Sequence, residues 1–434
     1  MMNSQVIAHS EVEHKVTNKV ILRLIPFLLL LYVISYIDRV NISFAALEMN
    51  KSLGFNAEIY GLAAGFFFIG YFIFEIPSNI LLNKFGAKVW LARILVTWGL
   101  MVVLTGFVQN ATQMYIVRFC LGLAEAGFFP GIILYMRKWF PTQMLAKIVA
   151  LFMCGVPVAF VIGSPLSTWL IDNVSLFGYE GWRWMYFIEG AMAIIVAPIT
   201  YFYLSDGIAE AKWLTESEKQ TLILKMDASQ KITSHTSPLI ALKDARVWYF
   251  ALIYFIYISS SLGLIYFMPA MIKQLPNSFT NFQVGLMSAL PYLVGGVAMV
   301  MWGRHSDRTQ ERRFHAILPM LLLAAAYFFM AFVAQQSSVY LLLTGLIFAL
   351  IGTLSFNGPF WSYANQNMSA DKAVVGIALI NSLGGLGGFS GPYLMGMMKD
   401  TYQSTTPAII MMGCCLLINS VLVLLSKKFF AGKK

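Results

Sequence analysis

Long apolar segments constrain this chain more than any other feature of its sequence. Stretches of about 20 mostly apolar residues recur along the 434 residues, and one helix of that length spans the core of a bilayer. Charged residues make up only 12% of the chain, about half the fraction usual in soluble proteins. The sequence therefore predicts an all-α polytopic membrane protein with twelve transmembrane helices, near 20–47, 57–82, 87–108, 111–137, 144–171, 183–205, 246–272, 280–303, 314–334, 337–366, 371–396 and 405–427.

The distribution of Lys and Arg predicts the orientation, because short cytoplasmic loops carry an excess of these residues. With a cytoplasmic N-terminus, the outside loops hold only Lys51, Lys273 and Lys399, with Arg183 at a border. The inside loops then hold Lys84, Lys88, Arg137, Lys138, Lys147, Arg304, Arg308, Arg312, Arg313 and Lys372. We therefore expect a multi-pass protein of the cell inner membrane with both termini cytoplasmic. Membrane topology also accounts for the net charge of +10 without a nucleic-acid partner.

The four cysteines all lie in apolar runs, and the sequence has no metal-ligand spacing. We therefore expect neither a disulfide framework nor a metal or organic cofactor. The expected partners are the lipid bilayer and small molecules, and the protein is expected to be a monomer.

One long polar segment, 206–245, divides the predicted helices into two sets of six. It contains the pattern of a helix N-terminal capping box, with Thr215 as the cap and Glu218 three residues later, so we expect a short surface helix to follow. The basic loops 79–88 and 303–312 occupy equal places in the two sets and align with a shift of 224 residues. We interpret this as an internal repeat, as found in transporters that rock around a midplane site. The alternative is two unrelated loops.

The predicted domains are therefore an N-terminal six-helix half (1–205), a cytoplasmic linker (206–245) and a C-terminal six-helix half (246–434).

The loop GRHSDRTQERR (303–313) resembles the G-x-x-x-D-R-x-G-R-R loop of the major facilitator superfamily. The resemblance implies a conformational role for Gly303, Asp307 and Arg308. In the first copy of the loop, Asn79 and Asn83 replace the Gly and the Asp. The twelve predicted helices in two halves agree with the major facilitator fold.

Further segments are similar to the anion:cation symporter family of this superfamily, which contains proton symporters for sugar acids, tartrate and aromatic acids. They are YIDRVNISFA (36–45), GYFIFEIPSNILLNKFG (70–86), RFCLGLAEAGFFPGIILYMRKWFP (118–141), GWRWMYFIEG (181–190) and AKWLTESEK (211–219). The resemblance implies a proton-coupled organic-anion symporter. It also implies that Asp38, Arg39, Arg118 and Glu125 form the coupling and anion-binding set, with a contribution from Tyr71.

The chemistry of these four residues supports the same interpretation. A charge at the centre of a bilayer costs at least about 2.5–3.5 kcal/mol, so it should face a partner or a wet cavity. Arg118 and Glu125 are two helical turns apart and therefore lie on nearly the same face. Arg39 is predicted to anchor the carboxylate of the substrate, Asp38 and Glu125 to carry protons, and Arg118 to tune the acids. The alternative is a static cluster of ion pairs that only joins two helices.

Neutral polar and aromatic residues are expected to complete the pocket: Tyr36, Tyr266, Trp361, Ser362 and Asn381. For each of them, ordinary packing between helices is the alternative. The fifth predicted helix has no polar side chain except Cys154 between Met153 and Ser164, which favours an anion less polar than a sugar acid.

Two further acids in predicted spans are given structural roles. Glu75 is expected to cap or bridge near the cytoplasmic end of its helix, with a third proton site as the alternative. Glu189 is expected to flank the sixth helix without a role in transport.

The sequence thus predicts an importer of a small organic carboxylate that works by alternating access and is driven by inward proton flow. An exchanger or uniporter without net proton coupling is the first alternative. A second alternative is a non-transporting membrane sensor that signals through 206–245. An enzyme is not expected, since the sequence contains neither a nucleophile–base set nor a cofactor motif.

Overall fold

The computed structural model describes residues 2–229, 243–368 and 370–431, and within these ranges the regular secondary structure is entirely helical. The helices are α1 (Met2–Leu53), α2 (Ala57–Phe85), α3 (Ala87–Thr105), α4 (Ala111–Glu125), α5 (Phe128–Arg137), α6 (Thr142–Met153), α7 (Gly155–Asn173), α8 (Gly181–Tyr203), α9 (Glu216–Ser229), α11 (Ala245–Lys273), α12 (Asn281–Thr309), α13 (Arg313–Val333), η1 (Ala334–Gln336), α14 (Val339–Gln366), α15 (Ala370–Gly385), α16 (Gly387–Tyr402) and α17 (Thr406–Ala431).

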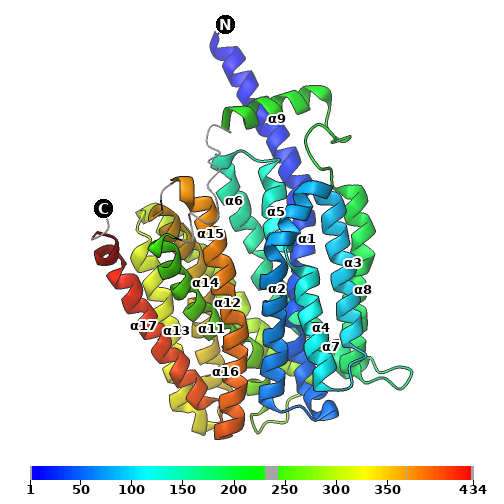
Figure 1. The fold of residues 1–434 in the computed structure, drawn as a ribbon, viewed down its shortest axis with the longest axis vertical. Helices are drawn as coiled ribbons and strands as arrows, with labels where there is room; N and C mark the ends of the chain where they lie inside the picture. The colour runs from blue at the N-terminus through cyan, green and yellow to red at the C-terminus, as the bar shows by residue number, and fades with distance from the viewer. Residues whose placement is uncertain (1, 230–242, 369, 432–434) are drawn as a thin grey trace.

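Eleven helical segments in the described part of the chain are long and apolar enough to cross a membrane. The remaining predicted span, 371–396, is formed by α15 and α16, which contain 16 residues each and meet at Leu386. Figure 1 shows these helices standing side by side, with α1–α8 on one side and α11–α17 on the other. We call these sets the first and second helix groups. The predicted all-helical polytopic fold is confirmed, and twelve spans account for the bundle.

Three predicted spans are broken in the middle, and the sequence explains each break. Proline removes a backbone donor and clashes with the carbonyl four residues earlier. Pro157 stands four residues after Met153, where α6 ends, and Pro130 stands four residues after Ala126, where α4 gives way to α5. The break between α15 and α16 lies in the glycine-rich stretch LGGLGG (383–388), where a helix bends easily.

Helix α1 is longer than the predicted 20–47 and projects beyond the bundle, where α9 lies across it (Figure 1). The predicted capping box is confirmed: the Glu218 amide donates to Thr215 Oγ1 at 3.3 Å, and the Thr215 amide donates to Glu218 Oε2 at 2.8 Å. Lys19 Nζ on α1 donates to both Glu218 oxygens at 2.8 Å, which docks α9 on α1. Residues 230–242 of the predicted linker lie outside the described residues, so the division into domains stays a prediction.

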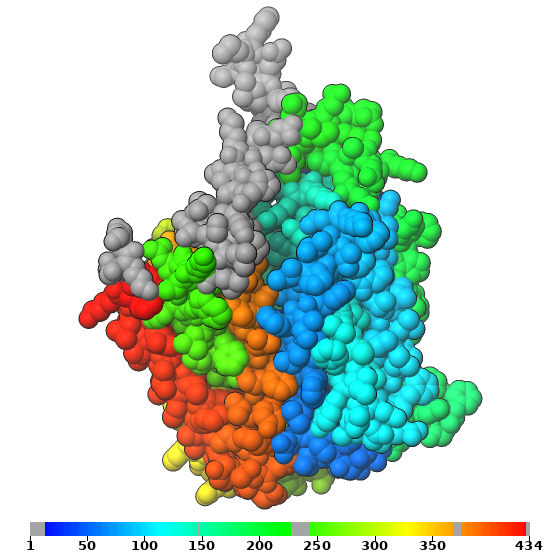
Figure 2. Space-filling model, viewed as in Figure 1, coloured from blue at the N-terminus to red at the C-terminus, as the bar shows by residue number. Residues whose placement is uncertain are grey.

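The two helix groups are in contact mainly at one end of the bundle. Both chain termini lie at the opposite end (Figure 1), which we call the terminus end; the other is the far end. Contacts between the groups are made chiefly by α16 with α2 and by α7 with α12, and Figure 2 shows α2 and α16 packed against each other. A Cβ atom at Gly61 of α2 would lie 2.3 Å from the Pro392 carbonyl oxygen, so this approach requires glycine.

A carboxylate from each group caps a helix of the other group at the far end. Asp400 of α16 accepts hydrogen bonds from the amides of Ala57 at 3.1 Å and Glu58 at 2.7 Å, at the start of α2. Asp172 of α7 accepts from the Phe282 amide at 2.8 Å and from Asn281 Nδ2 at 2.7 Å, at the start of α12. A carboxylate at a helix N-terminus also interacts favourably with the helix dipole.

These two caps are related by the internal repeat. Helices α2 and α12 each contain 29 residues and begin 224 positions apart, at residues 57 and 281. That is the shift found between the two basic loops in the sequence. The first and second helix groups are therefore fastened together at the far end by two equivalent contacts.

We expect the docking of α9 to weaken in acid. Hydrogen bonds from Lys19 hold the pKa of Glu218 below its ordinary value. The ion pair therefore stabilises docking above the ordinary value of about 4.3 and is lost as the pH falls through the lowered pKa. Hydrogen exchange of the α9 amides should accelerate over that range and become independent of pH in Glu218→Gln. The matched control is Glu216→Gln, which removes only a pair within α9; an equal effect of both variants would contradict the docking role.

The two carboxylate caps should hold the far end closed. In the Asp172→Asn/Asp400→Asn variant the acceptors lose their charge, so we expect the far end to open more often. Spin labels at the exposed positions Phe177 and Tyr340 would report this as a longer distance in a larger fraction of molecules. The control is Asp206→Asn, which weakens a similar cap on Lys88 within one helix group. Unchanged distances in the double variant would exclude a gating role for the caps.

Candidate functional site

A buried ion pair joins α1 and α4 in the middle of the bundle. Arg39 Nη2 lies 2.5 Å from Glu125 Oε1, and Ser35 Oγ of α1 donates to the same oxygen at 2.8 Å. The Glu125 side chain is 1% exposed, whereas the Arg39 side chain is 17% exposed. The carboxylate is therefore enclosed, and the guanidinium reaches accessible space. Two of the four predicted charged residues thus form a direct pair.

The backbone around Glu125 is shaped by glycines. Glu125 is the last residue of α4, and Gly127, with φ of 84°, turns the chain into α5. A left-handed backbone of this kind is strained for any residue with a side chain. Gly122 of α4 packs so closely on α2 that an added Cβ would lie 2.0 Å from the Phe67 carbonyl oxygen. This close packing places Glu125 beside α1 and α2.

Asp38 points away from Arg39, although the two are adjacent in sequence. Neighbouring residues on an α-helix project about 100° apart. Trp98 Nε1 of α3 donates to Asp38 Oδ2 at 2.6 Å, and Asp38 is 1% exposed. Among the described residues, no cation forms an ion pair with Asp38. The two charges that stand together in the sequence therefore face different neighbours.

Arg118 is fully buried and has no ion-pair partner among the described residues. Its Nε donates to the Ala63 carbonyl oxygen at 3.4 Å, and both of its terminal nitrogens lack a hydrogen-bond partner. Its guanidinium carbon lies 5.3 Å from the centre of the Phe67 ring, and that of Arg39 lies 5.2 Å from the same centre. Two guanidinium groups and one ion-paired carboxylate therefore share a small region. We call Arg39, Arg118 and Glu125 the charge cluster.

Three predicted tyrosines lie at the charge cluster. The Arg39 guanidinium carbon is 5.0 Å from the Tyr36 ring centre and 5.5 Å from that of Tyr71, and both tyrosines are half-buried. Tyr266 of α11 donates from its hydroxyl to the Arg39 carbonyl oxygen at 3.3 Å, which connects the second helix group to the cluster.

The remaining predicted wall residues lie on α14 and α15. Trp361 packs against Tyr254 with ring centres 4.8 Å apart, and Ser362 beside it is half-buried. Asn381 Nδ2 and Ser382 Oγ donate to the Glu75 carboxylate at 3.4 and 2.6 Å. Glu75 of α2 thus bridges the two helix groups.

The conformational loop residues lie apart from the charge cluster, at the terminus end of α12. Arg312 Nη1 donates to Asp307 Oδ1 at 2.7 Å, and Arg308 is exposed. Gly303 is half-buried in the same last turns of α12.

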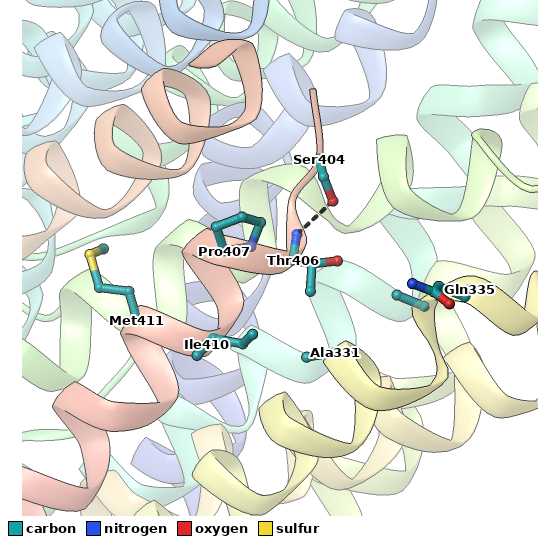
Figure 3. A pocket seen from close by; sticks show the side chains of 8 residues that line it. Ala331, Gln335, Ser404, Thr406, Pro407, Ile410 and Met411 are labelled. Atoms are coloured by element: carbon teal, nitrogen blue, oxygen red, sulfur yellow. Dashed lines mark hydrogen bonds between the residues drawn. The ribbon is translucent and has the colours of Figure 1, made fainter. Parts of the chain in front are cut away.

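A surface pocket between α13, η1 and the start of α17 is shown in Figure 3. It is lined by Ala331, Ala334, Gln335, Ser404, Thr406, Pro407, Ile410 and Met411. The lining contains no charged side chain, so this pocket does not match an anion site.

Sequence reasoning missed the neutral partners of the acids. Ser35 and Trp98 hold Glu125 and Asp38, and Asn41 and Ser167 hold Glu189. Ser35 and Asn41 share the polar stretch of α1 with Asp38, which was the available signal. Trp98 and Ser167 carry no such signal in their local sequence.

The fold and the family agree. The family model of the Major Facilitator Superfamily matches residues 28–392. The chain belongs to the Major Facilitator Superfamily. It is therefore a multi-pass membrane transporter and not an enzyme, as the sequence predicted, and the predicted major facilitator fold is confirmed.

Individual relatives cover nearly the whole chain. A protein of Agrobacterium vitis, provisionally named a tartrate transporter, is 44% identical over 96% of this chain and 92% of its own length. A quinolone resistance transporter of Acinetobacter baumannii is 36% identical over 94% of each chain. Among solved structures, a bacterial homolog of the human lysosomal transporter Spinster, inward-facing and occupied, has a TM-score of 0.75 at 16% identity and covers 93% of this chain and 96% of its own. This last likeness concerns the fold.

The ion pair of the charge cluster should contribute to stability. Removing one partner leaves the other charge buried, which costs on the order of 3 kcal/mol. We expect Arg39→Ala and Glu125→Ala each to lower the thermal unfolding midpoint in detergent, and the double variant to be more stable than the sum of both losses predicts. The exposed Lys19–Glu218 pair is the control, because such pairs contribute about 0–1 kcal/mol. Strictly additive losses at Arg39 and Glu125 would show that the two side chains are not coupled.

Proposed function

We propose that this protein is a proton-coupled symporter that imports a small organic carboxylate by alternating access. The observation that supports this most is the charge cluster, in which a buried carboxylate occupies one guanidinium while a second guanidinium has no counter-ion. Static helix pairing would need only the pair. An additional buried cation suits a site whose ligand is an anion.

The ion pair gives a route for coupling protons to the anion. When Glu125 is ionised it holds Arg39, so a substrate carboxylate must compete for that guanidinium. When Glu125 binds a proton the ion pair is lost, and Arg39 is free to hold a carboxylate through two parallel hydrogen bonds. Proton binding therefore raises anion affinity, and by linkage anion binding raises proton affinity. Asp38 is proposed as a second proton carrier, because it is buried without a cation.

The charge balance favours a small dicarboxylate. With Glu125 protonated, Arg39 and Arg118 together carry two positive charges, which a dianion would neutralise. Tartrate is the first substrate to test, since the relative from Agrobacterium vitis carries that provisional name. Tyr36, Tyr71 and Tyr266 would bind beside the carboxylates, and Trp361, Ser362 and Asn381 would form the neutral wall.

The exposed basic residues at the ends of α2, α5 and α12 favour a cytoplasmic terminus end in the inner membrane: Lys84, Arg137, Lys138, Arg304 and Arg308. The caps at the far end then close the protein toward the outside. We further propose that Gly303, Asp307 and Arg308 act in the conformational change, and that the protein works as a monomer with protons as its only coupling ion.

Uptake into proteoliposomes tests this function. With an inwardly directed proton gradient, we expect wild-type protein to accumulate labelled tartrate against its concentration gradient. Glu125→Gln should lose this accumulation but keep exchange of tartrate across the membrane, because the neutral amide leaves Arg39 free. The exposed Glu180→Gln is the control. Uptake that ignores the proton gradient would favour an exchanger or uniporter, and transport of a quinolone instead would assign a different cargo.

Lysine substitutions distinguish the two guanidinium groups. Lysine keeps the charge but loses the planar pair of donors, so Arg39→Lys should weaken tartrate binding by tenfold or more, roughly the worth of one charge-assisted hydrogen bond. Thermal shift with increasing tartrate measures the effect. If affinity is unchanged in Arg39→Lys but falls in Arg118→Lys, the main anchor is Arg118.

A further inference from the structure

Glu189 is a second buried acid without a counter-ion, and neither the ion pair nor the pocket uses it. It lies near the middle of α8 and is fully buried. Ser167 Oγ of α7 donates to Oε1 at 2.6 Å, and Asn41 Nδ2 of α1 donates to Oε2 at 3.1 Å. Among the described residues no cation pairs with it. Two neutral donors therefore hold a group that could carry a full charge.

Asp38 shares this region. It precedes Asn41 by one helical turn on α1, and it is close enough to Glu189 for the two charges to interact. One of its oxygens accepts from Trp98, and the other, Oδ1, is buried without a partner. Two carboxyl groups without cations thus lie between α1, α3, α7 and α8, on the side of α1 away from the Arg39 guanidinium.

The surroundings of the two acids contain few other charges. The titratable and polar groups facing them are Trp98 from α3, Ser167 from α7, Asn41 from α1, Tyr186 from α8, and Arg118 and Glu125 from α4, of which Glu125 is already paired with Arg39. Two carboxylates that close together in a buried region cannot both ionise without a large cost, so the first proton they bind is held strongly.

We propose that Asp38 and Glu189 act as one proton-binding pair, separate from the charge cluster, and that Glu189 sets the proton affinity of Asp38. This rests on the proposed proton-coupled function, in which Asp38 is a proton carrier. Releasing the shared proton leaves two negative charges side by side, whereas releasing it from Asp38 alone leaves one. Glu189 therefore raises the pH at which Asp38 gives up its proton. Its role is to tune a proton carrier from behind α1, with no contact to the substrate.

Infrared spectroscopy can follow the pair without any transport. A protonated carboxylic acid has its own C=O stretch, and its loss with rising pH gives the midpoint of titration. We expect Glu189→Gln, which keeps the size of the side chain and its acceptor for Ser167, to move the midpoint assigned to Asp38 toward acid by about one pH unit or more. Asp38→Asn/Glu189→Gln should remove that band. Glu180→Gln, at an exposed acid of the same helix group, should leave it unchanged.

The same variants separate tuning from a structural role in transport. Proton-driven tartrate uptake by Glu189→Gln should keep its maximal rate at a lower pH and show the same acid shift in its pH profile. A uniform loss of rate with an unmoved profile and an unmoved infrared midpoint would overturn the proposal. If instead the infrared midpoint shifts while wild-type uptake ignores the proton gradient, the acid pair stands and the proposed symport fails.

Discussion

The contact between Arg39 and Glu125 is the interaction on which the centre of this structure depends. A charge inside a membrane protein must be paired or hydrated, and this pair solves the problem for one residue of α1 and one of α4. The solution requires α4 to approach α2 closely at Gly122 and to end at Glu125, where Gly127 redirects the chain. The break in the fourth span is therefore tied to the position of the carboxylate.

The charges of the bundle core are distributed unequally between the two helix groups. Arg39, Arg118 and Glu125 all belong to the first group, whereas the second contributes neutral groups such as Tyr266 and Trp361. This asymmetry has an energetic consequence for alternating access. The charge cluster keeps its internal contacts when one group rocks against the other, and only neutral side chains slide past it. Moving neutral groups avoids separating buried charges, which would cost several kcal/mol.

The sequence predicted what depends on local pattern and missed what depends on direction. Helix positions followed from apolar length, and the Thr215–Glu218 capping box followed from residue spacing. The sequence also placed Asp38 and Arg39 side by side, but adjacency could not show that they face different helices. Their directions are set by α3 and α4, which lie far along the chain. For the same reason Glu189 read as a structural residue, because its partners Asn41 and Ser167 come from two other helices.

The contacts at the far end have the strength that a reversible closure needs. A carboxylate that caps a helix contributes about 0.5–2 kcal/mol, and the structure has one such cap in each direction, at Asp172 and Asp400. Two caps together change a conformational equilibrium by roughly tenfold to a thousandfold, since 1.4 kcal/mol corresponds to a factor of ten. Neutralising a buried charge cluster with a proton and an anion releases free energy of the same order. The closed end can therefore be stable at rest and still yield when the site is filled, because neither contribution overwhelms the other.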